Sequence, residues 1–139
     1  MSNGEKARQL LTSAGRYLEV MEKALASAWW NMAVREAAEV VELCLKGALS
    51  YLLVDYPKVH DVGAFFVRTL AGRGIALSGR EAAEVQQASA SLARRRAPAF
   101  YFETDETGEN AREAAENARR IHNLCLRIIA DTGGDGADA

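Results

Sequence analysis

The sequence predicts an all-α fold, an antiparallel up-and-down helical bundle with four long helices and one short one. Three observations support this prediction. Apolar residues recur at helical steps of three and four along most of the chain, and no segment shows the strict alternation of a half-buried strand. In addition, one central segment is apolar on every side but one. Five helices with short connections are typical of a bundle.

The central segment, from about Trp29 to Val54, carries a single line of polar residues. Its members, which we call the polar seam, recur at steps of four, four, three, four and four: Asn31, Arg35, Glu39, Glu42, Lys46 and Ser50. These steps place all six on one stripe of a helix. A helix with one narrow polar stripe must be enclosed on its other sides, so we expect this segment to be the central rod of the bundle.

The polar seam has two interpretations. It is either a solvated stripe held by the i,i+4 pairs Arg35–Glu39 and Glu42–Lys46, or the lining of a groove or subunit interface. The adjacent tryptophans Trp29 and Trp30 favour an interface, because they project in different directions and only one can enter the core.

A first helix is expected to begin near Asn3 and to be interrupted at Ser27, before the central helix. Its apolar face reads Ala7, Leu10, Leu11, Ala14, Leu18, Met21 and Leu25. The central helix should end at Tyr56-Pro57, because proline disfavours the helical conformation in the residue before it.

Asp61 is positioned to cap a short third helix that Gly72 and Gly74 bring to an end. Ser78 with Glu81 forms the capping box of a fourth helix. We expect that helix to end near residue 96, because Pro98 should break it.

The last helix should span residues 110 to 130, after an acidic loop at residues 103–109. Residues 131–139 are rich in glycine and aspartate and have nothing to bury, so we expect a disordered tail. The folded domain is therefore predicted to cover residues 1–130.

Composition excludes several classes of function. The net charge of -2 gives no global attraction to nucleic acid or anionic membrane, and no apolar run is long enough to span a bilayer. The N-terminus lacks the order of a secretion signal, so we expect a cytoplasmic protein. Cys44 and Cys125 fall on apolar helix faces and match no metal-ligand spacing, and no phosphate-loop, dinucleotide, zinc-protease or nucleophile-elbow motif is present. We expect no metal and no cofactor.

Two segments carry a resemblance to a known family. Residues 54–62, VDYPKVHDV, follow an Ala/Glu-rich helix, and residues 94–101 read RRRAPAFY. Together they make the chain resemble HEPN (higher eukaryotes and prokaryotes nucleotide-binding) domains over about residues 2–129. The resemblance implies a helical bundle, usually a symmetric dimer. Prokaryotic members often act beside a small nucleotidyltransferase, in toxin–antitoxin or defence systems.

Many catalytic HEPN proteins are metal-independent ribonucleases that carry Arg-x(4–6)-His near the last helix. Here the arginines before His122 are Arg120, Arg119 and Arg112, at separations of two, three and ten. The motif is absent, so the resemblance is closer to the non-catalytic, binding type. The alternative is an endoribonuclease that uses His122 with Arg119, with two copies of His122 meeting across a dimer. His122 is otherwise a core histidine bonded to a neighbouring carbonyl or hydroxyl.

Two places are predicted to bind a nucleotide or another anion. Lys58 and His60 precede a helix N-terminus, where exposed N–H groups attract phosphate, although His60 or Asp61 also suits a cap for that helix. Arg94, Arg95 and Tyr101 belong to the basic–aromatic cluster of the chain, a combination that binds nucleotides or single-stranded RNA. The alternative there is structural: Phe100 and Phe102 plug the end of the bundle, while the arginines pair with Glu103, Asp105 and Glu106.

The sequence therefore predicts a non-catalytic nucleotide- or RNA-binding module. We expect it to form a homodimer and to act with a separately encoded partner such as a nucleotidyltransferase.

Overall fold

The computed structural model describes residues 2–136 and contains five helices and, within those residues, no strand. This confirms the all-α bundle. The helices are α1 (Asn3–Ala26), α2 (Trp30–Tyr51), α3 (Gly63–Gly72), α4 (Gly79–Phe100) and α5 (Gly108–Gly136). No helix in the described part of the chain is long and apolar enough to cross a membrane.

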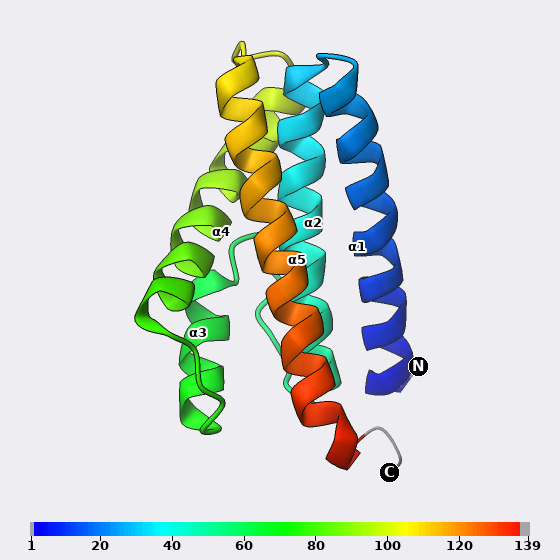
Figure 1. Cartoon of the computed structure of the whole chain (residues 1–139), viewed down its shortest axis with the longest axis vertical. Helices are drawn as coiled ribbons and strands as arrows, with labels where there is room; N and C mark the ends of the chain where they lie inside the picture. Colours follow the sequence, from blue (N-terminus) through cyan, green and yellow to red (C-terminus); the bar gives the residue numbers. More distant parts are fainter. Residues whose placement is uncertain (1, 137–139) are drawn as a thin grey trace.

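Helix α2 lies at the centre of the bundle and packs against α1, α4 and α5 (Figure 1). Each long helix runs opposite to the long helix before it, while the short α3 packs mainly against α4. Of the 22 residues of α2, 15 are buried, so the prediction of an enclosed central rod is confirmed.

The turn between α1 and α2 is tight. Ser27 ends α1, and Ala28 adopts a left-handed conformation with φ of 60° before α2 begins at Trp30. At the other end of α1, the Ser2 hydroxyl accepts a hydrogen bond from the backbone N–H of Glu5 at 3.1 Å. The predicted start and interruption of this helix therefore agree with the structure.

Alanine makes up much of the core. The buried alanines are Ala7, Ala14, Ala24, Ala33, Ala37, Ala38, Ala48, Ala88, Ala99, Ala111, Ala114, Ala115 and Ala118. Small side chains let helices approach closely. At Gly47 of α2, an added Cβ would lie 2.8 Å from Cγ of Leu11, so the Leu11 side chain of α1 packs directly against the backbone of α2 there. Larger residues, among them Leu45 and Phe66, fill the remaining space.

Two predicted helix ends differ from the structure. The prediction that Pro98 breaks the fourth helix is wrong, because α4 continues to Phe100. Proline removes its own N–H donor wherever it stands, but only two helical residues follow Pro98, and the N–H of Tyr101 still donates to the Ala97 carbonyl at 3.0 Å. The amide of Asn31 also donates to the Ala99 carbonyl at 3.1 Å and holds the last turn in place.

Helix α5 extends beyond the predicted end at residue 130 and reaches Gly136. The hydroxyl of Thr132 donates a hydrogen bond to the backbone carbonyl of Ile128 at 2.7 Å in this added turn. Residues 137–139 of the predicted tail lie outside the described residues.

Candidate anion-binding pocket

A pocket of 720 Å³ lies where the start of α1, the second half of α2 and the loop after α2 meet. Its volume is in the range of small-molecule sites. Its lining residues are Asn3, Lys6, Glu42, Lys46, Ser50, Val54, Asp55, Tyr56, Lys58, Val59 and His60. The structure thus brings the predicted binding residues Lys58 and His60 together with two further lysines.

The loop reaches this position through a Schellman turn at the end of α2. Leu53 adopts a left-handed conformation with φ of 62°. The N–H of Leu53 donates to the Ser50 carbonyl at 3.0 Å, and that of Val54 donates to the Leu49 carbonyl at 2.9 Å. The helix therefore ends at Tyr51, several residues before Tyr56-Pro57, where the sequence predicted its end.

Tyr56 joins the loop to both helices. The Lys6 ammonium of α1 lies 4.8 Å from the centre of its ring, and the Lys46 ammonium of α2 lies 5.4 Å from it. Both distances are within the range of cation–π attraction. The ring therefore holds two positive charges at the pocket wall.

Glu42 is the acidic centre of the pocket. Its Oε2 pairs with the Lys46 ammonium at 2.8 Å, and its Oε1 lies 2.9 Å from Nδ1 of His60. Lys6 and Lys58 are exposed and make no ion pair within the described residues. Two ammonium groups thus remain available to an anion.

Asp61 fixes the far end of the loop. One of its carboxylate oxygens accepts from the backbone N–H of Gly63 at 3.2 Å and from the hydroxyl of Ser89 at 2.7 Å. The side chain of His60 instead contacts Glu42. The N-cap residue of α3 is Val62, which makes no side-chain cap, so neither predicted residue occupies the cap position. Asp61, one position earlier, still binds the first N–H of the helix, and His60 stays at the pocket.

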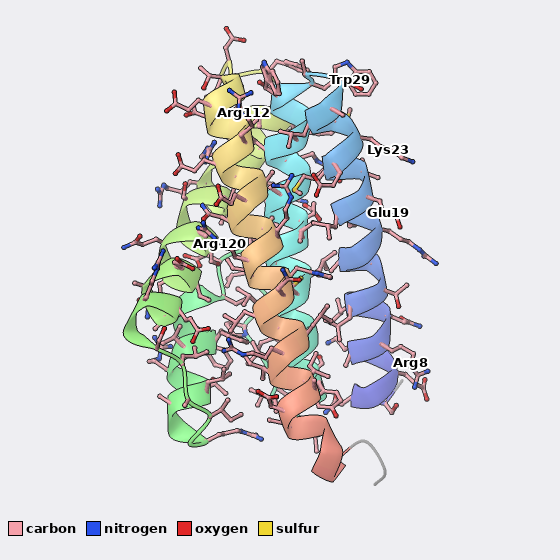
Figure 2. The ribbon with its side chains drawn as sticks, viewed as in Figure 1. Arg8, Glu19, Lys23, Trp29, Arg112 and Arg120 are labelled. Atoms are coloured by element: carbon pink, nitrogen blue, oxygen red, sulfur yellow. The ribbon has the colours of Figure 1, made fainter. Side chains whose placement is uncertain are left out.

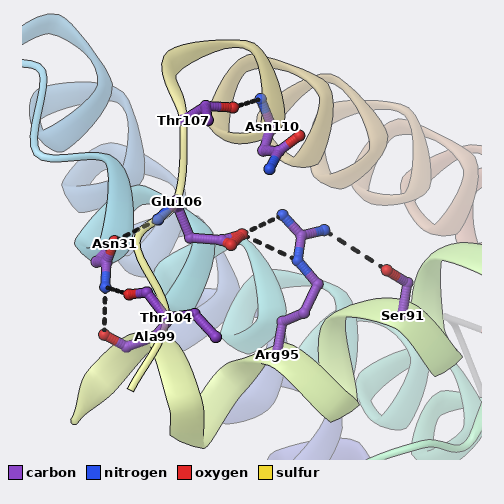
Figure 3. Close-up of polar contacts among 8 residues, drawn as sticks. All are labelled: Asn31, Ser91, Arg95, Ala99, Thr104, Glu106, Thr107 and Asn110. Carbon is purple, nitrogen blue, oxygen red and sulfur yellow. Dashed lines mark hydrogen bonds and ion pairs between the residues drawn. The ribbon is translucent and has the colours of Figure 1, made fainter. Parts of the chain in front are cut away.

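The other predicted binding residues, Arg94, Arg95 and Tyr101, lie elsewhere. They lie near the opposite end of α2, where Asn31 contacts the connection between α4 and α5. Asn31 and Lys46 are about 22 Å apart along the axis of α2. Arg95 is paired there with Glu106, at 2.6 Å between Nη2 and Oε1 (Figure 3). Arg94 and Tyr101 are exposed.

The structural alternative for this cluster holds only in part. The pairing of Arg95 with Glu106 agrees with it, whereas Arg96 pairs with Glu39 of α2. Phe100 and Phe102 do not plug the bundle, since they are 50% and 76% exposed. Their rings lie outside because the last turn of α4 directs Ala99 into the core instead.

The polar seam is not a solvated stripe. Asn31, Glu39 and Ser50 are buried, and Arg35, Glu42 and Lys46 are partly buried. The predicted Glu42–Lys46 pair forms. The predicted Arg35–Glu39 pair does not form, because Arg35 pairs with the adjacent Glu36 and Glu39 pairs with Arg96. The polar seam is therefore the face of α2 that contacts polar side chains of other segments, among them Arg96 of α4 and His60 of the loop after α2.

His122 lies half-buried on α5, and burial lowers its pKa. The guanidinium of Arg119 pairs across the bundle with Glu22 of α1, at 2.7 Å between Nε and Oε2. No hydrogen bond joins Arg119 to His122 among the described residues. In the described part of the chain, no group of three or more His, Cys, Asp or Glu side chains could hold a metal ion.

The family model of the HEPN domain matches residues 7–129. The chain belongs to the HEPN domain family. Neither the curated proteins nor the solved structures contain a significant match. Membership of the HEPN family supports a nucleotide- or RNA-related function in general terms.

Sequence reasoning about this HEPN domain missed Lys6, Lys46 and Tyr56 as members of the pocket. A signal was present for each of them. Lys46 belongs to the polar seam and Tyr56 to the segment that carries the family resemblance. The position of Lys6 could have been inferred from the antiparallel packing of α1 and α2, which places the start of the first helix beside the end of the second.

Proposed function

We propose that this HEPN domain is a non-catalytic module that binds a phosphate-bearing ligand, either a nucleotide or a segment of RNA. The ligand lies in the pocket lined by Lys6, Lys46 and Lys58, which we call the lysine pocket. The observation that carries the proposal is the pair of ammonium groups of Lys6 and Lys58, which have no ion-pair partner among the described residues and lie at a 720 Å³ pocket. Family membership points in the same direction.

The chemistry of the lining suits a phosphate ester. Ammonium groups bind phosphate as point charges. Lys6 and Lys58 are free to do so, whereas Lys46 is already neutralised by Glu42. Asp55 and Glu42 keep the net charge of the pocket modest, so we expect weak binding that falls with added salt.

Calorimetry with ATP, GTP and a short single-stranded RNA tests the proposal. We expect Lys6→Ala and Lys58→Ala each to weaken binding about five- to tenfold and to reduce its salt dependence. Lys23→Ala is the matched control, because Lys23 projects from the same helix as Lys6 near the opposite end of the bundle (Figure 2). Equal affinities in all four proteins, or no binding of any ligand, would refute the proposal.

We further propose that the module is a cytoplasmic homodimer that acts with a nucleotidyltransferase partner in a toxin–antitoxin or defence system. Exposed Trp29, Tyr101 and Phe102 favour an assembly, because a small monomer rarely leaves so many aromatic rings in water. Light scattering should give twice the 15.1 kDa chain mass, and a concentration-independent monomer would contradict the dimer. Affinity purification from the native cell tests the partner.

A further inference from the structure

The contact between His60 and Glu42 fixes which ring nitrogen carries the proton. Nδ1 of His60 lies 2.9 Å from Oε1 of Glu42. A carboxylate that pairs with an ammonium only accepts hydrogen bonds, so Nδ1 must be the donor. In the neutral ring, Nε2 then holds a lone pair and acts as an acceptor.

In this contact, the Glu42 side chain is mostly buried and the His60 side chain is exposed. The second oxygen of Glu42 pairs with Lys46 at 2.8 Å, and both of these side chains are only 13% exposed. The side chain of His60 is 57% exposed. Asp61 anchors the next position of the loop to Gly63 and Ser89. The imidazole is therefore held through Nδ1, and Nε2 is the nitrogen left for a ligand.

We propose that Nε2 of His60 accepts a hydrogen bond from a ribose hydroxyl of the ligand, so that the pocket prefers ribonucleotides to 2′-deoxyribonucleotides. The inference rests on the proposed function, in which Lys6 and Lys58 hold the phosphate. An acceptor nitrogen repels phosphate oxygens, which are acceptors too, and therefore calls for a donor beside the phosphate. The bases also carry N–H donors, but the donors of the sugar that bears the phosphate are its ribose hydroxyls, and the 2′-hydroxyl distinguishes RNA from DNA.

The test is the ratio of affinities for matched ligand pairs at pH 8. ATP is compared with 2′-dATP, and a short RNA with the DNA of the same sequence, so that free nucleotide and polynucleotide are tested separately. One hydrogen bond predicts that the ribo form binds about three- to tenfold more tightly in at least one pair.

Three variants separate this role from phosphate binding. His60→Ala should abolish the preference. Glu42→Gln should abolish it as well, because the Lys46 ammonium keeps the amide oxygen, and the amide nitrogen then donates to Nδ1 and moves the ring proton to Nε2. Lys58→Ala should weaken both members of a pair equally and keep the ratio.

The outcomes distinguish the two proposals. Equal binding of ribo and deoxy forms by the unaltered protein, or an unchanged ratio in His60→Ala, would overturn the inference and leave the phosphate pocket standing. A complete lack of binding to every ligand would overturn both. Circular dichroism of each variant checks that the bundle is intact.

Discussion

The side-chain oxygen of Asn31 accepts a hydrogen bond from the backbone N–H of Glu106 at 2.9 Å. The nitrogen of the same amide donates to the carbonyls of Ala99 at 3.1 Å and Thr104 at 2.7 Å (Figure 3). One buried side chain therefore satisfies three backbone groups, one in the last turn of α4 and two in the connection between α4 and α5. Backbone groups of a connection need such partners when they lie at the edge of a core.

Asn31→Ala should lower the free energy of unfolding by about 2–4 kcal/mol, because it leaves several partly buried backbone groups without partners. Urea denaturation measures the change. Asn110→Ala is the control, since Asn110 is exposed and its contact to Thr107 uses only its backbone N–H. The control should stay within about 0.5 kcal/mol of the unaltered protein. A similarly small effect of Asn31→Ala would contradict the account of this network.

Arg95 and Arg94 should differ sharply on substitution, although they are neighbours in the sequence. Arg95→Ala leaves the carboxylate of Glu106, which is 7% exposed, without its guanidinium, so we expect a loss of about 1–3 kcal/mol in unfolding free energy. Arg94→Ala removes an exposed side chain and should be nearly neutral. Neither should change nucleotide affinity at the lysine pocket. A loss of binding in either variant would move the site to this end of the bundle.

Gly63 and Gly15 should respond oppositely to alanine. A Cβ at Gly63 would lie 2.7 Å from Cβ of Ser89 and 3.0 Å from the Val85 carbonyl oxygen, so Gly63→Ala should destabilise by about 1–3 kcal/mol. At Gly15, in the middle of α1, no atom apart from the adjacent residues and backbone of its own helix lies within 4 Å of the added Cβ. Gly15→Ala should therefore stabilise the protein by about 0.5–1 kcal/mol. Thermal melts measure both changes. If the two substitutions shifted the melting temperature in the same direction, the close packing of Gly63 against α4 would be wrong.

His122 should make the protein sensitive to mild acid. Burial lowers the pKa of His122 below its usual 6.5, so the folded state resists protonation more than the unfolded state. Its contribution to stability is fully present above the unfolded pKa and is lost as pH falls through the folded pKa. The unaltered protein should therefore lose more unfolding free energy between pH 7.5 and 5 than His122→Gln does. Parallel pH profiles for the two proteins would rule this out.

The two thiols should be inert in the native state. Burial raises the pKa of Cys44 to about 12 and places that of Cys125 well above its usual value. The thiolate is the reactive form, so a thiol reagent at pH 8 should label neither residue until the protein unfolds. Both should then react in denaturant. Rapid labelling of the folded protein would show that the core opens locally around α2 and α5.

Local signals in the sequence were enough to predict most of the helices. Ser78 and Glu81 form both hydrogen bonds of the predicted capping box, at 3.0 and 2.9 Å. These features depend on residues a few positions apart, so no tertiary information is needed. The end of α4 was missed because it depends on Asn31, which is 68 positions away in the chain.

The candidate site was predictable only in part for the same reason. Lys58 and His60 share one loop, and the sequence places them together. Lys6 joins them only through the packing of α1 against α2. For Arg95 the sequence left two interpretations open, a ligand contact and an ion pair with an acidic residue of the following loop, and the structure forms the pair with Glu106.

The alanine-rich contacts around α2 have a mechanical consequence. An alanine side chain has no rotamers, so close helix contacts built from Ala37, Ala48 and Ala115 cannot absorb a displacement by side-chain rearrangement. Interiors of this density transmit strain. Because these contacts cannot repack, α2 is held as one stiff element along its length.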